Sequence, residues 1–545
     1  MSFHPYARPN RSSWSLGLDA LVERTSRALK DIQSPEAAIL GSRVRPSRQC
    51  SAQPELGDDT EAILVDKLDK YTARYQCPQL QKEQADWENF YDNPQNWPAR
   101  KKWRVVAIAT WLSFITSLAS SIITPSLPDI ASDLRIESNA VTILIVSLFL
   151  LGTGVGGILS VPLSEMHGRL PIYQFSNVCF TALTVSCGFA PNFPVLIALR
   201  FLAGSLGTAC LVIGGCTCAD MFLPQQRATA ISLWAGGIFL GSCIGPVFGG
   251  LIVEAKNWRW IFYILAMAAG ASMIVCALFM PETSVLVIRR RRGVPVFQRE
   301  KETQSPQHPA KHSLRDLTLP LKLLAFSPIV LLMTFHAAIA HAMLYLLFTS
   351  IPFTFSPRYQ FSPRDTGLLY LAPALGMMLG AFAAGQLGDR TVKRIKALGG
   401  TYTPEKRLDP MIIITGSLSM IAGLLLYGWS LHYHIHWISA LAGLFMFGFG
   451  LVLTVASAQT YVVESHPTYE ANVSAAFSLL NAVLSGALPV WGVEIFYSLG
   501  MGWGSVLLAG LVAISSFAFV VCRVKGPYLR QRFKIESRSG GYGHV

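Results

Sequence analysis

Stretches of about twenty mostly apolar residues follow one another along this chain from position 103 to position 524, with short polar segments between them. A helix needs about 20 residues to cross the hydrocarbon core of a bilayer, and only helices and closed barrels satisfy their own backbone hydrogen bonds in lipid. The pattern therefore predicts about twelve spanning helices. They are expected at residues 103–124, 141–163, 170–190, 194–219, 228–253, 258–280, 328–348, 367–387, 411–431, 437–461, 474–497 and 506–524.

A polar stretch divides the predicted spans into two sets of six. We expect an amino-terminal six-helix bundle at residues 98–280, a basic central loop at 281–327 and a carboxy-terminal six-helix bundle at 328–524. Residues 1–97 lack an apolar run long enough for a signal peptide and are rich in polar residues and proline, which predicts a disordered cytoplasmic tail. Residues 525–545 are expected to form a second tail.

The composition excludes an ordinary soluble protein. Of the 545 residues 51% are hydrophobic and only 14% are charged, against about 25% charged residues in soluble domains. Short cytoplasmic loops of membrane proteins retain Lys and Arg. With a cytoplasmic amino terminus, the basic residues before the first span, after the sixth and eighth spans and after the twelfth all fall on the cytoplasmic side. The net charge of +13 is therefore interpreted as a topology signal and not as a nucleic-acid-binding surface.

Glycines recur at every fourth position of the predicted fifth span. Residues four apart lie on one face of a helix, and a face without side chains forms a groove in which another helix can approach closely. The members of this glycine ladder are Gly237, Gly241, Gly245 and Gly249, with Pro246 inside the series and Gly250 closing it. The ladder predicts tight helix packing along most of the span.

One loop pattern occurs in both halves, as PLSEMHGRLP after the second span and GQLGDRTVKR after the eighth. Each copy places a carboxylate at a helix end with arginine close behind. Such a pair can form in one conformation and separate in another, whereas an ordinary solvated turn is the alternative. The candidate latch residues are Glu165, Gly168, Arg169, Gly385, Asp389 and Arg390.

Arg200 is the clearest charged residue inside a predicted span. An ionisable group in a span is costly and usually functional, so Arg200 is a candidate for proton coupling. The alternative is that its long side chain reaches the lipid headgroups at the nearer membrane surface.

Further ionisable residues are candidates because histidine titrates near neutral pH and a carboxylate can carry a proton. His336 and His341 lie in the seventh span and Glu494 near the end of the eleventh, where structural or interfacial roles are the alternative. Asp220 and Glu464 fall at helix ends and are interpreted as caps of loops.

Several stretches resemble the major facilitator superfamily. The segment GSCIGPVFGG resembles the superfamily's fifth-helix antiporter motif, LRFLAGSLG around Arg200 its fourth-helix motif, and the two loop copies its cytoplasmic loop signature. Together with ADMFLPQQR, NWRWIFYI and PETSVLVIRRR, in this order, they look like the twelve-helix drug:proton antiporters of fungi. The resemblance implies an all-α membrane protein with the major facilitator fold, in which two six-helix bundles alternate between inward and outward openings.

The resemblance also implies a function. We expect a transporter that exports small amphipathic molecules such as drugs, toxins or secondary metabolites in exchange for protons, with Arg200 in proton coupling and the fifth helix sealing against the opposite bundle. It is expected to be a monomer in the plasma membrane with both termini cytoplasmic, needing no cofactor or metal. A facilitator-fold importer of a nutrient is the alternative; a multispan enzyme or receptor is another, although we find no cluster of catalytic residues.

Overall fold

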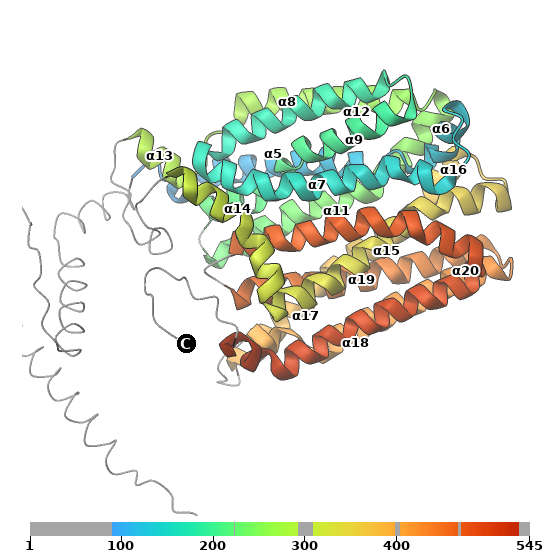
Figure 1. Ribbon diagram of the computed structural model, residues 1–545. Helices are drawn as coiled ribbons and strands as arrows, with labels where there is room; N and C mark the ends of the chain where they lie inside the picture. Colours follow the sequence, from blue (N-terminus) through green and yellow to red (C-terminus); the bar gives the residue numbers. More distant parts are fainter. Residues whose placement is uncertain (1–89, 223, 293–308, 398–403, 467–469, 533–545) are drawn as a thin grey trace, which may run out of the picture. The chain divides into compact units, whose positions relative to one another are not determined.

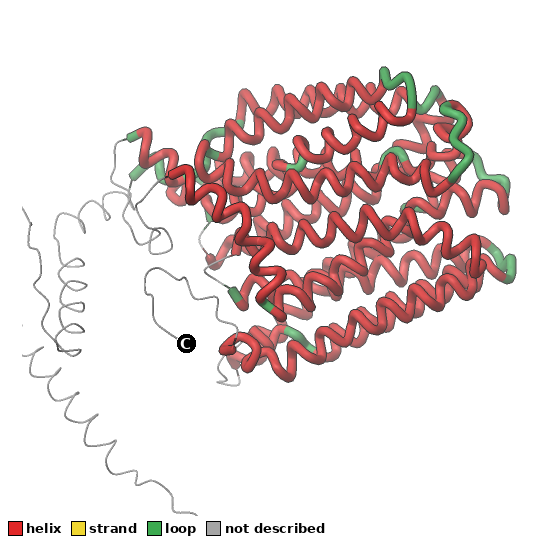
Figure 2. The backbone as a smooth tube through the Cα atoms, in the orientation of Figure 1, coloured by secondary structure: helices red, strands yellow, loops and turns green. Residues whose placement is uncertain are grey.

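The computed structural model describes residues 90–222, 224–292, 309–397, 404–466 and 470–532. Within these ranges the chain is helical and contains no strand (Figures 1 and 2). The predicted amino-terminal tail lies outside the described residues up to position 89. From there on it is ordered: Asn93 and Trp97 are buried, and the Lys101 ammonium lies 3.6 Å from the centre of the Trp97 ring.

The first half of the fold begins with α5. Its helices are α5 (Ala99–Ser121), η3 (Thr124–Ser126), α6 (Leu127–Asp133), α7 (Asn139–His167), α8 (Arg169–Gly188), α9 (Phe193–Gly207), α10 (Ala209–Met221), α11 (Pro224–Ala255) and α12 (Arg259–Phe279).

The second half follows a connection that contains two helices of its own. That connection carries α13 (Val285–Arg291) and α14 (Pro309–Phe326). The remaining helices are α15 (Pro328–Tyr359), α16 (Pro363–Leu369), α17 (Leu371–Ala397), η5 (Pro404–Arg407), α18 (Pro410–His432), α19 (Trp437–Ser465) and α20 (Glu470–Arg532).

The count of spans agrees with the sequence prediction. Ten segments of the described chain are long and apolar enough to cross a membrane. The longest, which lies in α20, is broken at Gly500, where a φ of 76° interrupts the helix, so it is two spans. Helix α8, with 20 residues, is a further helix of spanning length and packs against α9 and α12. The described residues therefore form twelve spanning helices of an all-α membrane protein.

The two halves meet mainly along five helices. Helix α7 packs along α20, and α11 packs against α16 and α17 (Figure 1). We call the end of the bundle where α5 begins and α7 ends the basic end, because the arginines of the predicted cytoplasmic loops lie there, and the other the opposite end. Helix α15 is buried almost without interruption from Ala337 to Pro352, which places it in the interior between its neighbours.

Candidate functional site

The glycine ladder of α11 packs against α5, a helix of the same half. A methyl group added at Gly245 would lie 2.5 Å from the Ser121 hydroxyl and 2.9 Å from the Leu118 carbonyl oxygen. Residues of α5 stand equally close to the other members of the ladder, Gly237, Gly241 and Gly249. The fifth helix was predicted to seal against the opposite bundle, but these four glycines do not make that contact. Glycine spacing shows that a helix comes close and leaves open which helix it is.

The contact of α11 with the second half is made at its last turns instead. A methyl group at Gly250 would collide with the Pro363 carbonyl and lie 3.1 Å from Cα of Gly367. From the other side, a methyl group at Gly367 would lie 2.8 Å from the Pro246 carbonyl oxygen. Gly250 and Pro246 of the sequence motif thus take part in closing the opposite end, together with Gly367, which sequence reasoning missed.

Hydroxyl groups join the halves nearer the middle of the bundle. The Ser120 hydroxyl of α5 and the Tyr345 hydroxyl of α15 are 3.0 Å apart, and both residues are buried. Nearby, the Cys243 sulfur of α11 lies 3.4 Å from the Met377 sulfur of α17. These contacts close the space between the halves from the middle towards the opposite end.

Arg200 is held inside the first half. Only 2% of the residue is exposed. Its Nε donates to the Ile145 carbonyl of α7 at 3.2 Å and an Nη donates to the Ala119 carbonyl of α5 at 3.0 Å. The guanidinium carbon lies 4.4 Å from the centre of the Phe149 ring, a distance typical of a cation–π contact. The side chain therefore joins three helices, and the alternative that it extends to the headgroups is wrong.

The first loop copy forms an ion pair, but with a partner that the sequence did not indicate. The Arg169 Nε donates to Asp220 Oδ2 at 3.2 Å, and an Nη donates to the Ser164 hydroxyl at 2.5 Å. Asp220, interpreted from the sequence as a loop cap, is thus the carboxylate that pairs with the loop arginine. Glu165, the carboxylate of the sequence pattern, is exposed on the last turn of α7.

Glu282 caps the start of α8 and was missed by sequence reasoning. Its carboxylate accepts from the Arg169 amide at 2.9 Å and from the Leu170 amide at 3.2 Å. The first N–H groups of a helix have no partner within the helix, and the Glu282 carboxylate supplies one here. An anion at this position also interacts favourably with the helix dipole. The adjoining Gly168 has φ 105°, and a methyl group there would lie 2.5 Å from Glu282 Oε2. Glycine is therefore required at position 168 for both conformation and space.

The second half repeats the ion pair with different residues. An Arg407 Nη lies 2.8 Å from Glu464 Oε1, and each side chain is 28% exposed. Arg407 precedes α18 as Arg169 begins α8, and Glu464 is the penultimate residue of α19 as Asp220 is of α10. The carboxylate interpreted as a loop cap is again the partner.

The predicted second latch pattern does not form the loop expected of it. Helix α17 continues through Gly385 and Arg390, an added methyl group at Gly385 would meet open space, and Arg390 is exposed. The side chain of Asp389 lies outside the described residues. Because the eighth span extends to Ala397 as a helix, its last basic residues lie on a helical extension.

Neutralising both ion-pair carboxylates tests the latch hypothesis. We expect Asp220→Asn combined with Glu464→Gln to slow transport about threefold to tenfold, because the two partly exposed pairs together contribute on the order of 1 kcal/mol. The measurement is the initial transport rate divided by the amount of protein in the membrane. Asp133→Asn is the matched control, since Asp133 pairs with Arg259 at 2.7 Å at the opposite end. An unchanged rate in the double variant would contradict the hypothesis.

The remaining candidates lie apart from one another. His336 is buried, its Nδ1 is 3.0 Å from the Ser515 hydroxyl, and its ring packs edge-on against Phe519. The Nδ1 of His341 lies 3.0 Å from the Ala337 carbonyl oxygen one turn earlier in α15. Glu494 is exposed on α20. The structure does not bring these side chains together with Arg200, and their role in proton transfer stays a prediction.

A bundle of twelve spanning helices in two halves, with matched ion pairs at the basic end, is the architecture of a membrane transporter. The sequence model of the Major Facilitator Superfamily matches residues 109–490, and the chain belongs to this superfamily. The predicted membership of the fungal efflux branch is confirmed by relatives named as transporters.

Two fungal relatives and two solved structures illustrate this. The efflux pump radE of Floropilus chiversii is 36% identical over 449 residues, covering 80% of this chain and 82% of its own. The MFS-type transporter penM of Penicillium rubens is 34% identical, covering 87% and 94%. The xylose transporter XylE of E. coli has a TM-score of 0.57 at 12% identity, covering 82% and 100%. A bacterial homologue of the lysosomal transporter Spinster has a TM-score of 0.55 at 14% identity, covering the same shares. The chain is thus a multi-pass transporter of small molecules, and the structural likenesses show the fold.

Proposed function

We propose that this protein exports small amphipathic molecules in exchange for protons, by alternating between an opening at the basic end and an opening at the opposite end. The observation that carries the proposal is the distribution of contacts between the halves. The halves touch through Gly250 and Gly367, through Ser120 and Tyr345 and along α7 and α20, whereas an added methyl group at Gly236, Gly385 or Gly388, nearer the basic end of α11 and α17, would meet open space. This distribution supports a state that opens towards the basic end.

The direction of transport is proposed from the relatives. A relative that shares 36% of its aligned residues is named an efflux pump, and the complete Gly-Pro and Gly-Gly pairs of α11 support the same direction. Secondary metabolites and drugs are the proposed cargo. The positive charge of the basic end supports a cytoplasmic position for both termini. A monomer in the plasma membrane is proposed with it.

Arg200 is proposed to serve proton coupling. It is a buried cation whose hydrogen bonds in this structure go to backbone carbonyls of α5 and α7. A cation held between helices raises the cost of any nearby positive charge and favours a negative one, so its field changes when the helices shift. Glu494 and His336 stay proposed proton carriers of lower rank, because neither lies beside it.

The function is tested by accumulation of a panel of fluorescent amphipathic dyes in yeast that lacks its own drug pumps. We expect cells with this chain to accumulate less dye than cells with the empty vector, and a protonophore to restore accumulation. Surface amounts are measured in parallel. Higher accumulation in cells with the chain would favour the importer, and lower accumulation that a protonophore leaves unchanged would contradict proton coupling.

A further inference from the structure

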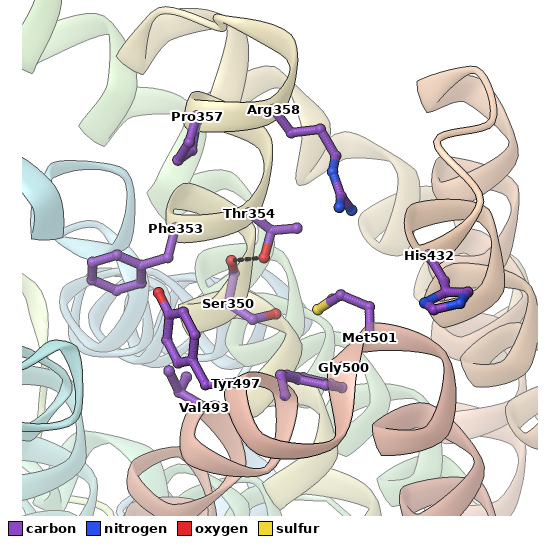
Figure 3. A pocket seen from close by; sticks show the side chains of 11 residues that line it. Ser350, Phe353, Thr354, Pro357, Arg358, His432, Val493, Tyr497, Gly500 and Met501 are labelled. Atoms are coloured by element: carbon purple, nitrogen blue, oxygen red, sulfur yellow. Dashed lines mark hydrogen bonds between the residues drawn. The ribbon is translucent and has the colours of Figure 1, made fainter.

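A pocket of about 460 Å³ opens at the opposite end of the second half. It lies between the last turns of α15, the end of α18 and the two helices of α20 that meet at Gly500 (Figure 3). All 11 lining residues belong to the second half. The pocket is therefore built within one bundle, apart from the contacts between Ser120 and Tyr345 that close the space between the halves. Its volume lies within the range of about 300–1,000 Å³ typical of small-molecule sites.

The polar wall of this pocket carries one cation, Arg358. Arg358 and His432 both line it, and its lining residues include neither Asp nor Glu. The partly buried Arg358 guanidinium donates through one Nη to the Leu431 carbonyl, and its other Nη lies 3.5 Å from Nε2 of His434. A guanidinium has five N–H donors in a planar fork that matches a carboxylate. Arg358 is thus positioned by the end of α18 and keeps donors for a ligand.

The other walls are apolar and aromatic. Phe353, Val493 and Phe496 line the pocket, and the Met501 side chain extends into the space below Arg358 (Figure 3). Phenyl rings and a thioether favour a flat aromatic body. The Tyr497 hydroxyl of the wall is 2.7 Å from Nδ2 of Asn139, at the start of α7. One wall of the pocket is therefore tied to the first half when the opposite end is closed.

We infer that this pocket binds weakly acidic aromatic small molecules, with the carboxylate or phenolate on Arg358 and the ring between Phe353, Phe496 and Met501. The inference concerns a binding site within the second half. It does not depend on the direction of transport or on proton coupling, and it is measured as binding.

The test is binding of radiolabelled 2-naphthoate to the purified full chain in lipid nanodiscs, compared with the neutral 2-naphthamide. We expect naphthoate to bind at least tenfold more tightly than the amide, because a hydrogen bond to a charged group is the stronger kind. Arg358→Gln is expected to weaken naphthoate binding about tenfold or more, and Met501→Trp, which fills the pocket, to weaken both probes. The matched control is Arg135→Gln, an exposed arginine at the same end in the first half, which should leave binding unchanged.

Hydrogen–deuterium exchange of the unmodified chain locates the site without any variant. Naphthoate is expected to slow exchange in peptides covering 350–358 and 493–501. Protection confined to peptides of α5 and α11, or naphthoate affinity that is the same in the wild type, Arg358→Gln and Met501→Trp, would overturn the inference. Equal affinity for naphthoate and naphthamide would overturn the assigned ligand class.

Discussion

Arg200→Ala is expected to lower proton-driven efflux at least tenfold while ligand binding is retained. The variant removes a cation that is 2% exposed and that joins α5, α7 and α9 through two carbonyls and the Phe149 ring. A charged group inside a membrane span is costly, so the retention of Arg200 in its span points to a use for the charge. Efflux is measured in energised proteoliposomes with an imposed pH gradient, and binding with the same fluorescent substrate.

Two matched variants separate charge from structure at this position. Arg200→Lys keeps the charge but has no planar fork to reach both carbonyls, whereas Arg200→Gln keeps hydrogen bonding without charge. If the charge serves coupling, the Arg200→Lys variant retains part of the efflux and the Arg200→Gln variant retains none. The opposite order, or efflux by Arg200→Ala at the wild-type rate, would show that the side chain only joins helices and would remove it from the proposed mechanism.

The number of spans and their grouping into two halves could be predicted from the sequence, because the cost of unpaired backbone groups in lipid forces each apolar run of about 20 residues to be a helix. The sequence did not predict the helices that form in polar segments. The chain from 281 to 327 was expected to be a loop, yet it contains α13 and α14, and the eighth span extends as a helix through Arg390. Polar helices at the membrane surface carry no long apolar run, so the pattern that finds spans does not find them.

Most residues of the candidate site could be predicted from the sequence, except Glu282 and Gly367, but their pairings could not. The loop arginine Arg169 was found, whereas its partners are Asp220 at the end of α10 and Glu282 in the connection after α12, 51 and 113 residues further along the chain. Likewise the glycines of α11 were found, but not that four of them face α5 and only Gly250 faces the second half. Spacing within a helix defines a face, and only the tertiary arrangement determines what lies against it.

Substitution of two neighbouring glycines of α11 by leucine is therefore expected to cause two different defects. In Gly249→Leu the new side chain would meet the carbonyl of Ile122, the residue directly after α5, inside one half and with no room to move away. Overpacking of this kind costs about 1–3 kcal/mol, so we expect severalfold less folded protein in the membrane. In Gly250→Leu the new side chain would meet Pro363 and Gly367 of the other half. Because the halves can separate there, we expect near-normal amounts of protein and loss of efflux.

The labelling rate of a native thiol, Cys243, reports whether the opposite end is open in the Gly250→Leu variant. Cys243 is 2% exposed and lies against Met377 between the halves, so it is protected while the opposite end is closed. If Gly250→Leu holds that end open, a membrane-impermeant maleimide added outside the cell labels Cys243 in the variant at least severalfold faster than in the wild type, with Cys243→Ser giving the background. Labelling at the wild-type rate together with lost efflux would show that Gly250 acts without closing the opposite end. Reduced protein in Gly250→Leu and normal protein in Gly249→Leu would contradict the assignment of the two glycines to their faces.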